Sequence, residues 1–171
     1  MTSILKVGEI QDPANSNSAL SIDASGQVLL SAIPYIRMQS TGSVSTTTTS
    51  NHATVPFNNV IASRGITLNT STYKFQVPVT GLYNFSGAVR WDRASSYLWW
   101  RVQDGSGTTV QPSALVLNNG NSGSFITSAG SFLCPLTAST DYLIDFGDGT
   151  NNTAVISPAQ TFMAIHLVGA S

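Results

Sequence analysis

Charged side chains are scarce in this chain of 171 residues, of which only 9% are charged. An ordinary soluble domain carries roughly 25% charged residues. The formal net charge is −1, and the seven basic residues are scattered along the sequence. Disorder requires a high net charge together with few apolar residues, and nucleic-acid recognition requires a basic patch. The composition therefore argues against both a disordered chain and a nucleic-acid-binding protein.

Cysteine and long apolar runs are also missing. Cys134 is the only cysteine, so no disulfide can form within the chain. No apolar run approaches the roughly 18 residues that a membrane-spanning helix requires. The stretch from Met1 to Leu30 lacks the charged segment and apolar run of a secretory signal peptide. We expect synthesis in a cytoplasm and no insertion into a membrane.

Small polar residues take the place of the missing charge, with 24 Ser, 19 Thr and 14 Gly. An amphipathic helix covers its solvent-facing side with Lys, Glu and Arg, and here Lys6, Lys74 and Glu9 are the only lysines and glutamate. Thr, Val, Phe, Tyr and Ile favour strands, and Gly and Asn favour turns. The composition predicts an all-β fold.

The first 32 residues consist of short apolar pieces separated by turn residues, and this pattern predicts a short N-terminal β arm. Two strand-like pieces, Ala19 to Ile22 and Gln27 to Leu30, flank the turn residues Asp23 to Gly26. An isolated hairpin is at best marginally stable in water, so this arm needs a partner. We expect it to anchor the chain to a larger body through its apolar residues Leu5, Val7, Ile10, Leu20 and Ile22.

Residues 33–171 predict a single β domain. Tyr83, Phe85 and Val89 alternate with polar or small residues, the pattern of a half-buried strand in an antiparallel sheet. Many short strands separated by Gly- and Asn-rich turns are typical of a sandwich or jelly roll. The other expected strands are 35–39, 54–57, 73–77, 97–103, 114–117, 124–133, 141–146 and 160–168.

The last of these strands is apolar on both sides, which indicates burial on both sides. One side faces the core, and either a covering loop or another molecule covers the other. Because large exposed apolar patches usually mark interfaces, we favour self-association. The side chains predicted for that interface are Trp100, Phe162, Ile165 and Leu167.

The run Tyr73-Lys74-Phe75-Gln76-Val77-Pro78-Val79-Thr80-Gly81-Leu82-Tyr83-Asn84-Phe85 resembles the signature of complement-type globular heads, jelly rolls of the tumour necrosis factor superfamily. The closing segment 160–167 resembles the last strand of that family, with Phe162 at the aromatic position. The resemblance covers about residues 33–170. It implies a jelly-roll head that forms a homotrimer.

The arm resembles the leader of many tailed-bacteriophage virion proteins, in the segments Leu5 to Asp12 and Ala19 to Val28. Together the two resemblances imply a trimeric tail fibre or tail appendage tip, located in the virion and made in the host bacterial cytoplasm. Its arm would bind other virion proteins, and its head would attach to the host surface, with cell-surface glycan as a candidate receptor. A capsid decoration protein (cement or head fibre) and a polysaccharide depolymerase remain alternatives.

The titratable residues form no catalytic motif. His52 follows a Ser/Thr-rich stretch, His166 lies in the closing strand, and Cys134 has apolar neighbours. A glycosidase needs two carboxylates that flank a cleft, and acids are few. We predict that the protein is not an enzyme and has no catalytic residue and no cofactor.

Three acids, Asp141, Asp145 and Asp148, lie close together in the sequence. Calcium favours clustered oxygen ligands, but the Asp-Gly and Asn residues around them are typical of a hairpin turn. We interpret this segment as a turn without a metal, and leave open a calcium ion near Asp145 and Asp148.

Aromatic residues gather between positions 91 and 100. Exposed Trp and Tyr stack on sugar rings and dominate interface energetics. If the head binds a glycan, the candidate contacts are Trp91 and Tyr97, which flank a short loop.

Overall fold

The computed structural model describes residues 9–11, 18–22, 24–25, 28–29, 33–41, 44–47, 52–92, 98–116, 125–148, 153–156 and 160–171. The chain divides into two compact units, Met1–Ile33 and Pro34–Ser171. We call them the arm and the head and describe each by itself. Within the described ranges, no helix is long and apolar enough to cross a membrane.

The arm is an antiparallel sheet in the order β1-β2-β3. Its strands are β1 (Glu9–Gln11), β2 (Ser18–Ile22) and β3 (Val28–Leu29). Of the five predicted anchoring residues, Ile10 and Leu20 pair across β1 and β2, and Ile22 pairs with Val28. Leu5 and Val7 lie outside the described residues.

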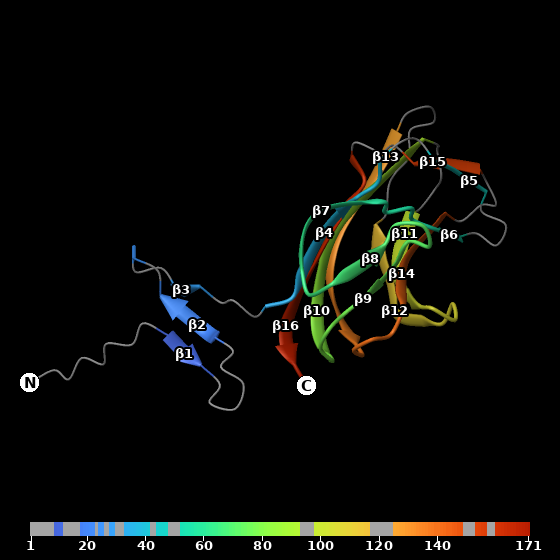
Figure 1. Cartoon of the computed structure of the whole chain (residues 1–171). Coiled ribbons are helices and arrows are strands. Elements are labelled where there is room, and N and C mark those ends of the chain that lie inside the picture. Colours follow the sequence, from blue (N-terminus) through green and yellow to red (C-terminus); the bar gives the residue numbers. More distant parts are fainter. Residues whose placement is uncertain are drawn as a thin grey trace, which may run out of the picture. The chain divides into compact units, whose positions relative to one another are not determined.

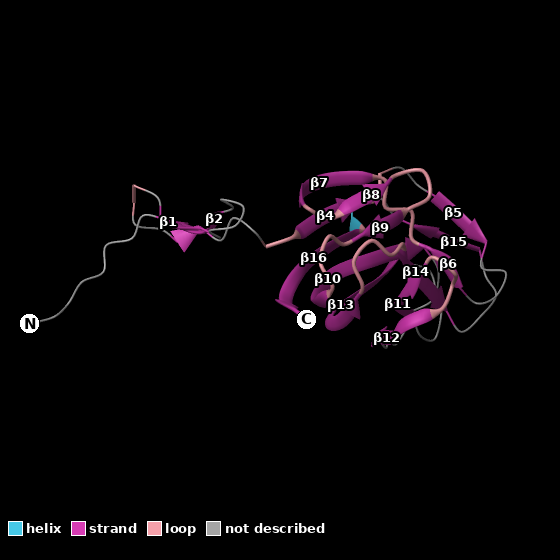
Figure 2. Cartoon of the chain, turned by 60° about the horizontal axis from the view of Figure 1, so that its bottom comes forward, coloured by secondary structure: helices cyan, strands magenta, loops and turns pink. Residues whose placement is uncertain are grey.

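In the described part of the head, the first of two sheets has the order β5-β15-β10-β16-β4-β7, and β13 also pairs with β10. One side of the head in Figure 2 shows β7, β4, β16, β10 and β13 in succession. The strands are β4 (Tyr35–Gln39), β5 (Val44–Thr47), β7 (Asn59–Arg64), β10 (Gly81–Asp92), β13 (Phe125–Leu136), β15 (Thr153–Ile156) and β16 (Phe162–Ala170).

The second sheet, again over the described residues, has the order β12-β11-β14-β9-β8, and β6 pairs with β14. Figure 1 shows the two sheets face to face. The strands are β6 (His52–Thr54), β8 (Thr67–Asn69), β9 (Lys74–Gln76), β11 (Leu98–Asp104), β12 (Thr109–Val116) and β14 (Tyr142–Asp148).

The core fills the space between the sheets with alternate residues of each strand. From the first sheet come Ile36, Met38, Tyr83, Phe85, Val89, Cys134, Leu136, Met163 and Ile165, and from the second come Phe75, Trp100, Val102, Tyr142, Ile144 and Phe146. Aromatic rings hold the two layers together, since Phe85 and Trp100 both pack on Phe132, with ring centroids 5.3 and 4.8 Å apart. Burying one large apolar side chain stabilises a fold by roughly 1.5–3 kcal/mol.

The head begins and ends at the same end of the sandwich. The Leu167 amide donates to the Pro34 carbonyl at 3.0 Å, and the Ser171 amide donates to the Thr80 carbonyl at 3.2 Å. The chain therefore enters the head beside its own C-terminus, as Figure 1 shows.

This architecture confirms the predicted all-β jelly-roll sandwich with a short β arm. Eight of the nine expected head strands are present, with ends shifted by up to five residues, and the expected strand 54–57 shares only Thr54 with β6. The sequence patterns did not predict β5, β7, β8 and β15 in the head or β1 in the arm.

Candidate interaction surface

The outer face of the first sheet carries exposed apolar side chains on three neighbouring strands. On β10 the buried Tyr83 and Phe85 alternate with outward-pointing residues that begin at Leu82. Leu82 is 37% exposed, Leu133 of β13 47%, and Phe162 and Val168 of β16 41% and 55%. We call Leu82, Leu133, Phe162 and Val168 the association face.

The position of these residues on one sheet is the evidence for an interaction surface. Of the eight large apolar side chains that are exposed in the described ranges, these four lie on adjacent strands. Single exposed apolar residues are normal on a protein surface, whereas a group of them on one face favours a contact with another molecule. Leu82, Leu133 and Val168 lie near one end of this face, and Phe162 lies opposite Ala88 towards the other end.

The centre of this outer face is flat. Ser86 pairs with Ser131 on one side and with Ala164 on the other, so three small residues lie in one row. From this row, Ser131 Oγ donates to Oδ1 of Asn84 in the next row at 3.0 Å. A flat row of small side chains lets another chain approach the sheet closely.

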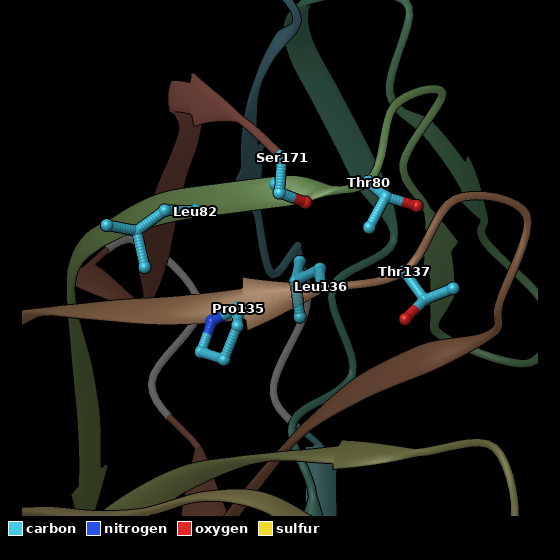
Figure 3. A pocket seen from close by; sticks show the side chains of 7 residues that line it. Thr80, Leu82, Pro135, Leu136, Thr137 and Ser171 are labelled. Atoms are coloured by element: carbon cyan, nitrogen blue, oxygen red, sulfur yellow. The ribbon is translucent and has the colours of Figure 1, made fainter.

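A pocket of about 380 Å³ adjoins the association face at the end where the chain terminates. Leu82, Pro135 and Leu136 give it apolar walls, and Thr80 and Thr137 place hydroxyl groups at its rim (Figure 3). Because Pro135 lies in β13, a strand that pairs only with β10 in the described sheet, it removes no hydrogen bond from a central strand.

Two of the four predicted interface residues were assigned to the wrong face. Trp100 is 0% exposed and Ile165 is 1% exposed, and both belong to the core of one chain. Leu167 packs partly against that core. Phe162 points outward and is open to solvent, so of the four only Phe162 belongs to the association face.

The aromatic segment divides between the two sides of β11. Trp100 enters the core, and the neighbouring Trp99 lies under the Arg101 guanidinium, whose Cζ is 4.8 Å from the ring centroid. Arg101 also binds Asp145, with Nη2 3.0 Å from Oδ2. Of the two predicted glycan contacts, Tyr97 lies outside the described residues, and Trp91 lies in β10 with a side chain that is not described.

Of the three acids, Asp141 and Asp145 have other partners in the described part of the chain. Asp145 is 1% exposed and is paired with Arg101, while Asp141 accepts a hydrogen bond from Gln76 Nε2 at 2.8 Å. The side chain of Asp148 is not described. Among the described residues, no group of three His, Cys, Asp or Glu side chains could hold a metal ion.

Cys134 is buried in the core, and burial raises the pKa of its thiol to about 12. Since the thiolate is the reactive form, we expect the native protein to react with a disulfide reagent such as DTNB about 100-fold more slowly than the urea-unfolded chain. The release of thionitrobenzoate measures this directly, because the chain has no second thiol. Complete reaction of the native protein within seconds would contradict the burial of Cys134.

The sequence alone did not reveal Leu82, Leu133 and Val168. A signal was available for Leu82, because the alternation that buries Tyr83 and Phe85 places residue 82 outside. Leu133 follows from Cys134 and Leu136 only when the register of β13 against β10 is known.

Comparison with known proteins leaves the family open and defines the fold. No family model matches the sequence, and no curated protein matches it. Murine APRIL superposes with a TM-score of 0.58 at 13% identity, over 80% of this chain and 99% of that one. The globular domain of zebrafish complement 1qA superposes with a TM-score of 0.58 at 13% identity, over 81% of this chain and 99% of that one.

A third neighbour is the TNF Eiger from S. frugiperda, with a TM-score of 0.54 at 10% identity, over 81% of this chain and 94% of that one. All three similarities cover about four-fifths of the chain, the share that the head represents. The head of this protein thus has the jelly-roll sandwich fold of the TNF-like and C1q-like domains.

Proposed function

We propose that this chain is a homotrimeric structural protein of a bacteriophage virion, a tail fibre or tail appendage tip. Three heads associate through their association faces, the arms bind other virion proteins, and the assembled heads attach to the host surface. The single observation that carries the self-association is the group of exposed apolar residues Leu82, Leu133, Phe162 and Val168 on three adjacent strands.

Burial of this face provides the energy for association. A fully buried Leu or Phe side chain contributes roughly 1.5–3 kcal/mol relative to an exposed one, and a closed ring of three copies buries the same patch three times. The adjoining pocket offers space for a side chain of a neighbouring copy. Ser131, Ser86 and Ala164 are all small, so over these three strands the row allows close approach, and the first long charged side chain in it is Arg37 on β4.

The division into two units supports the attachment role. The arm is a sheet of three short strands, and a small sheet of this kind is stable only when it has a hydrophobic face to bury. A surface on a larger particle would cover such a face. Three heads on one assembly also give avidity, so weak single contacts with a host receptor suffice.

Light scattering of the purified full chain tests the association. We expect a mass near three times 18.0 kDa for the wild type, and a single-chain mass for the double variant Leu133→Asp/Phe162→Asp, because six carboxylates would face one another in the trimer. Thr67→Asp, on an exposed position of β8 in the other sheet, is the matched control and should leave the mass unchanged. A wild type that elutes as a single chain at micromolar concentration would refute the proposal.

Labelling of intact particles with an antibody against the head tests the location. Label at the tail supports the fibre or appendage, label over the capsid would replace it with the decoration protein, and unlabelled particles would reject a virion role.

A further inference from the structure

Basic side chains gather on the outer face of β4 and β7, beside the association face. Tyr35 of β4 pairs with His166 of β16 on one side and with Arg64 of β7 on the other. In the next outward row, Arg37 pairs with Ala164 and Ala62. Directly paired side chains in a sheet lie about 5 Å apart at Cβ, and diagonal pairs about 7–8 Å. The register thus places Arg37, Arg64 and His166 around Tyr35, a group that we call the basic cluster.

The described strands of the first sheet carry almost no negative charge. Among the described residues of its strands, the only carboxylate is Asp92, at the far end of β10 from the chain terminus. The other described acids of the head, Asp104, Asp141, Asp145 and Asp148, lie in or beside strands of the second sheet. A chain with a net charge of −1 therefore presents one locally positive face.

The basic residues of the second sheet have partners, in contrast to Arg37. Arg101 is paired with Asp145, and Lys74 Nζ donates to the Gly105 carbonyl at 3.4 Å. Arg37 is exposed and has no hydrogen-bond or ion-pair partner among the described residues. The small side chains of Ala62 and Ala164 on either side leave its guanidinium open to an approaching ligand.

Arg64 is held in place by an aromatic ring. Its Cζ lies 5.7 Å from the centroid of Tyr35, within the range of a cation–π interaction. Such a contact orients the planar guanidinium, whose fork of donors matches a carboxylate or sulfate group. The Tyr35 ring and the exposed His166 imidazole add flat surfaces beside these donors.

We propose that the basic cluster binds an acidic polysaccharide through the carboxylate or sulfate groups of its sugars. This inference rests on the proposed attachment to a host surface and names the chemical class of the receptor. Guanidinium groups bind the acidic substituents, and the aromatic rings contact the sugar faces. Nucleic acid fits less well, because affinity for a duplex comes from many phosphate contacts and the cluster holds only three basic groups.

The test measures binding of the full-length protein to immobilised alginate, a linear polyuronate, at low ionic strength. Neutral dextran and a short DNA duplex are the comparison ligands. We expect binding to alginate that weakens as salt is added, no binding to dextran, and weaker binding to DNA. The double variant Arg37→Gln/Arg64→Gln should bind alginate about tenfold more weakly or worse. Lys74→Gln, which removes one positive charge from the second sheet, is the matched control and should bind like the wild type.

Three results would overturn the inference: no alginate binding by the wild type, equal binding by the double variant, or tighter binding to DNA than to alginate. The mass of the double variant is measured in parallel. An unchanged trimer with lost alginate binding supports the inference. A change of mass would show instead that the cluster contacts another copy of the chain. If the wild type is a single chain that still binds alginate through Arg37 and Arg64, the result rejects the proposed trimer but supports an acidic polysaccharide as the ligand.

Discussion

Replacement of Ile165 by Asp should prevent the head from folding, whereas the same replacement at Phe162, on the outer face of the same strand, should be tolerated. Ile165 is 1% exposed and pairs with Phe85 on β10 and with Ile36 on β4, both of them core residues. The substitution removes a buried aliphatic side chain and places a carboxylate among apolar groups. The two effects together should cost about 4 kcal/mol or more, a large part of the roughly 5–15 kcal/mol that stabilises a typical domain.

Urea unfolding followed by tryptophan fluorescence measures this loss. Ile165→Val, which removes one methylene group, should lower the free energy of unfolding by only about 1 kcal/mol. Phe162→Asp should have the same unfolding midpoint as the wild type when both proteins are measured as single chains, because residue 162 points outward. A folded Ile165→Asp protein that has merely lost its partners would mean that Ile165 lies at the interface and not in the core.

The contrast between positions 162 and 165 shows which features of the fold can be predicted from the sequence and which cannot. Composition alone predicts the all-β class, because Lys and Glu are too few to cover helices. Alternation in Tyr83 to Val89 correctly predicts a half-buried strand, and the burial of Tyr83, Phe85 and Val89 confirms it. Strong patterns of this kind depend only on neighbouring residues, so they can be read without knowledge of the fold.

The choice of face could not be made in this way where both sides of a strand are apolar. In β11 and β16, a shift of one residue exchanges the two faces. Either Trp99 or Trp100 could be the core residue of β11, and either Phe162 or Ile165 could be the core residue of β16, because both members of each pair are apolar. Only pairing with strands distant in sequence decides between them. Ile165 is fixed inward because its partners Phe85 and Ile36 are inward.

The missed strands β7 and β8 have a different cause. All but one residue of β7 are exposed, and the sequence Asn59–Arg64 carries no alternation. Such segments become strands because a neighbouring strand offers unpaired backbone groups, as β4 does for β7. The basic cluster was overlooked for the same reason, since Arg37 and Arg64 meet only through that pairing.

Replacement of Gly87 by Val should separate β10 from β16. A Cβ atom at position 87 would overlap the Phe162 carbonyl oxygen and would lie 2.9 Å from Met163 Sδ and 3.0 Å from Met163 Cα. Two of these three atoms belong to backbone that a rotamer change cannot move. We expect a loss of about 3 kcal/mol in the free energy of unfolding, at the upper end of the cost of overpacking a core.

Gly169→Val is the matched control, because it adds the same side chain to the same sheet at a position where the new Cβ would have no atom within 4 Å. It should be neutral or slightly stabilising, since Val favours strands and Gly weakens them. Both variants are compared by urea unfolding at one protein concentration, because association itself adds to the apparent stability. Equal midpoints for the two variants would show that β10 and β16 are not so closely packed at Gly87.

The same clash should also weaken self-association, and this links the core to the surface. The carbonyl that a valine side chain at position 87 would displace belongs to Phe162, whose ring lies on the association face. We therefore expect Gly87→Val to shift the mass in light scattering towards the single chain even under conditions where the head stays folded. Thr67→Asp, on an exposed position of the second sheet, is the control for this measurement and should keep the wild-type mass. A folded, fully trimeric Gly87→Val protein would mean that the position of Phe162 does not determine association.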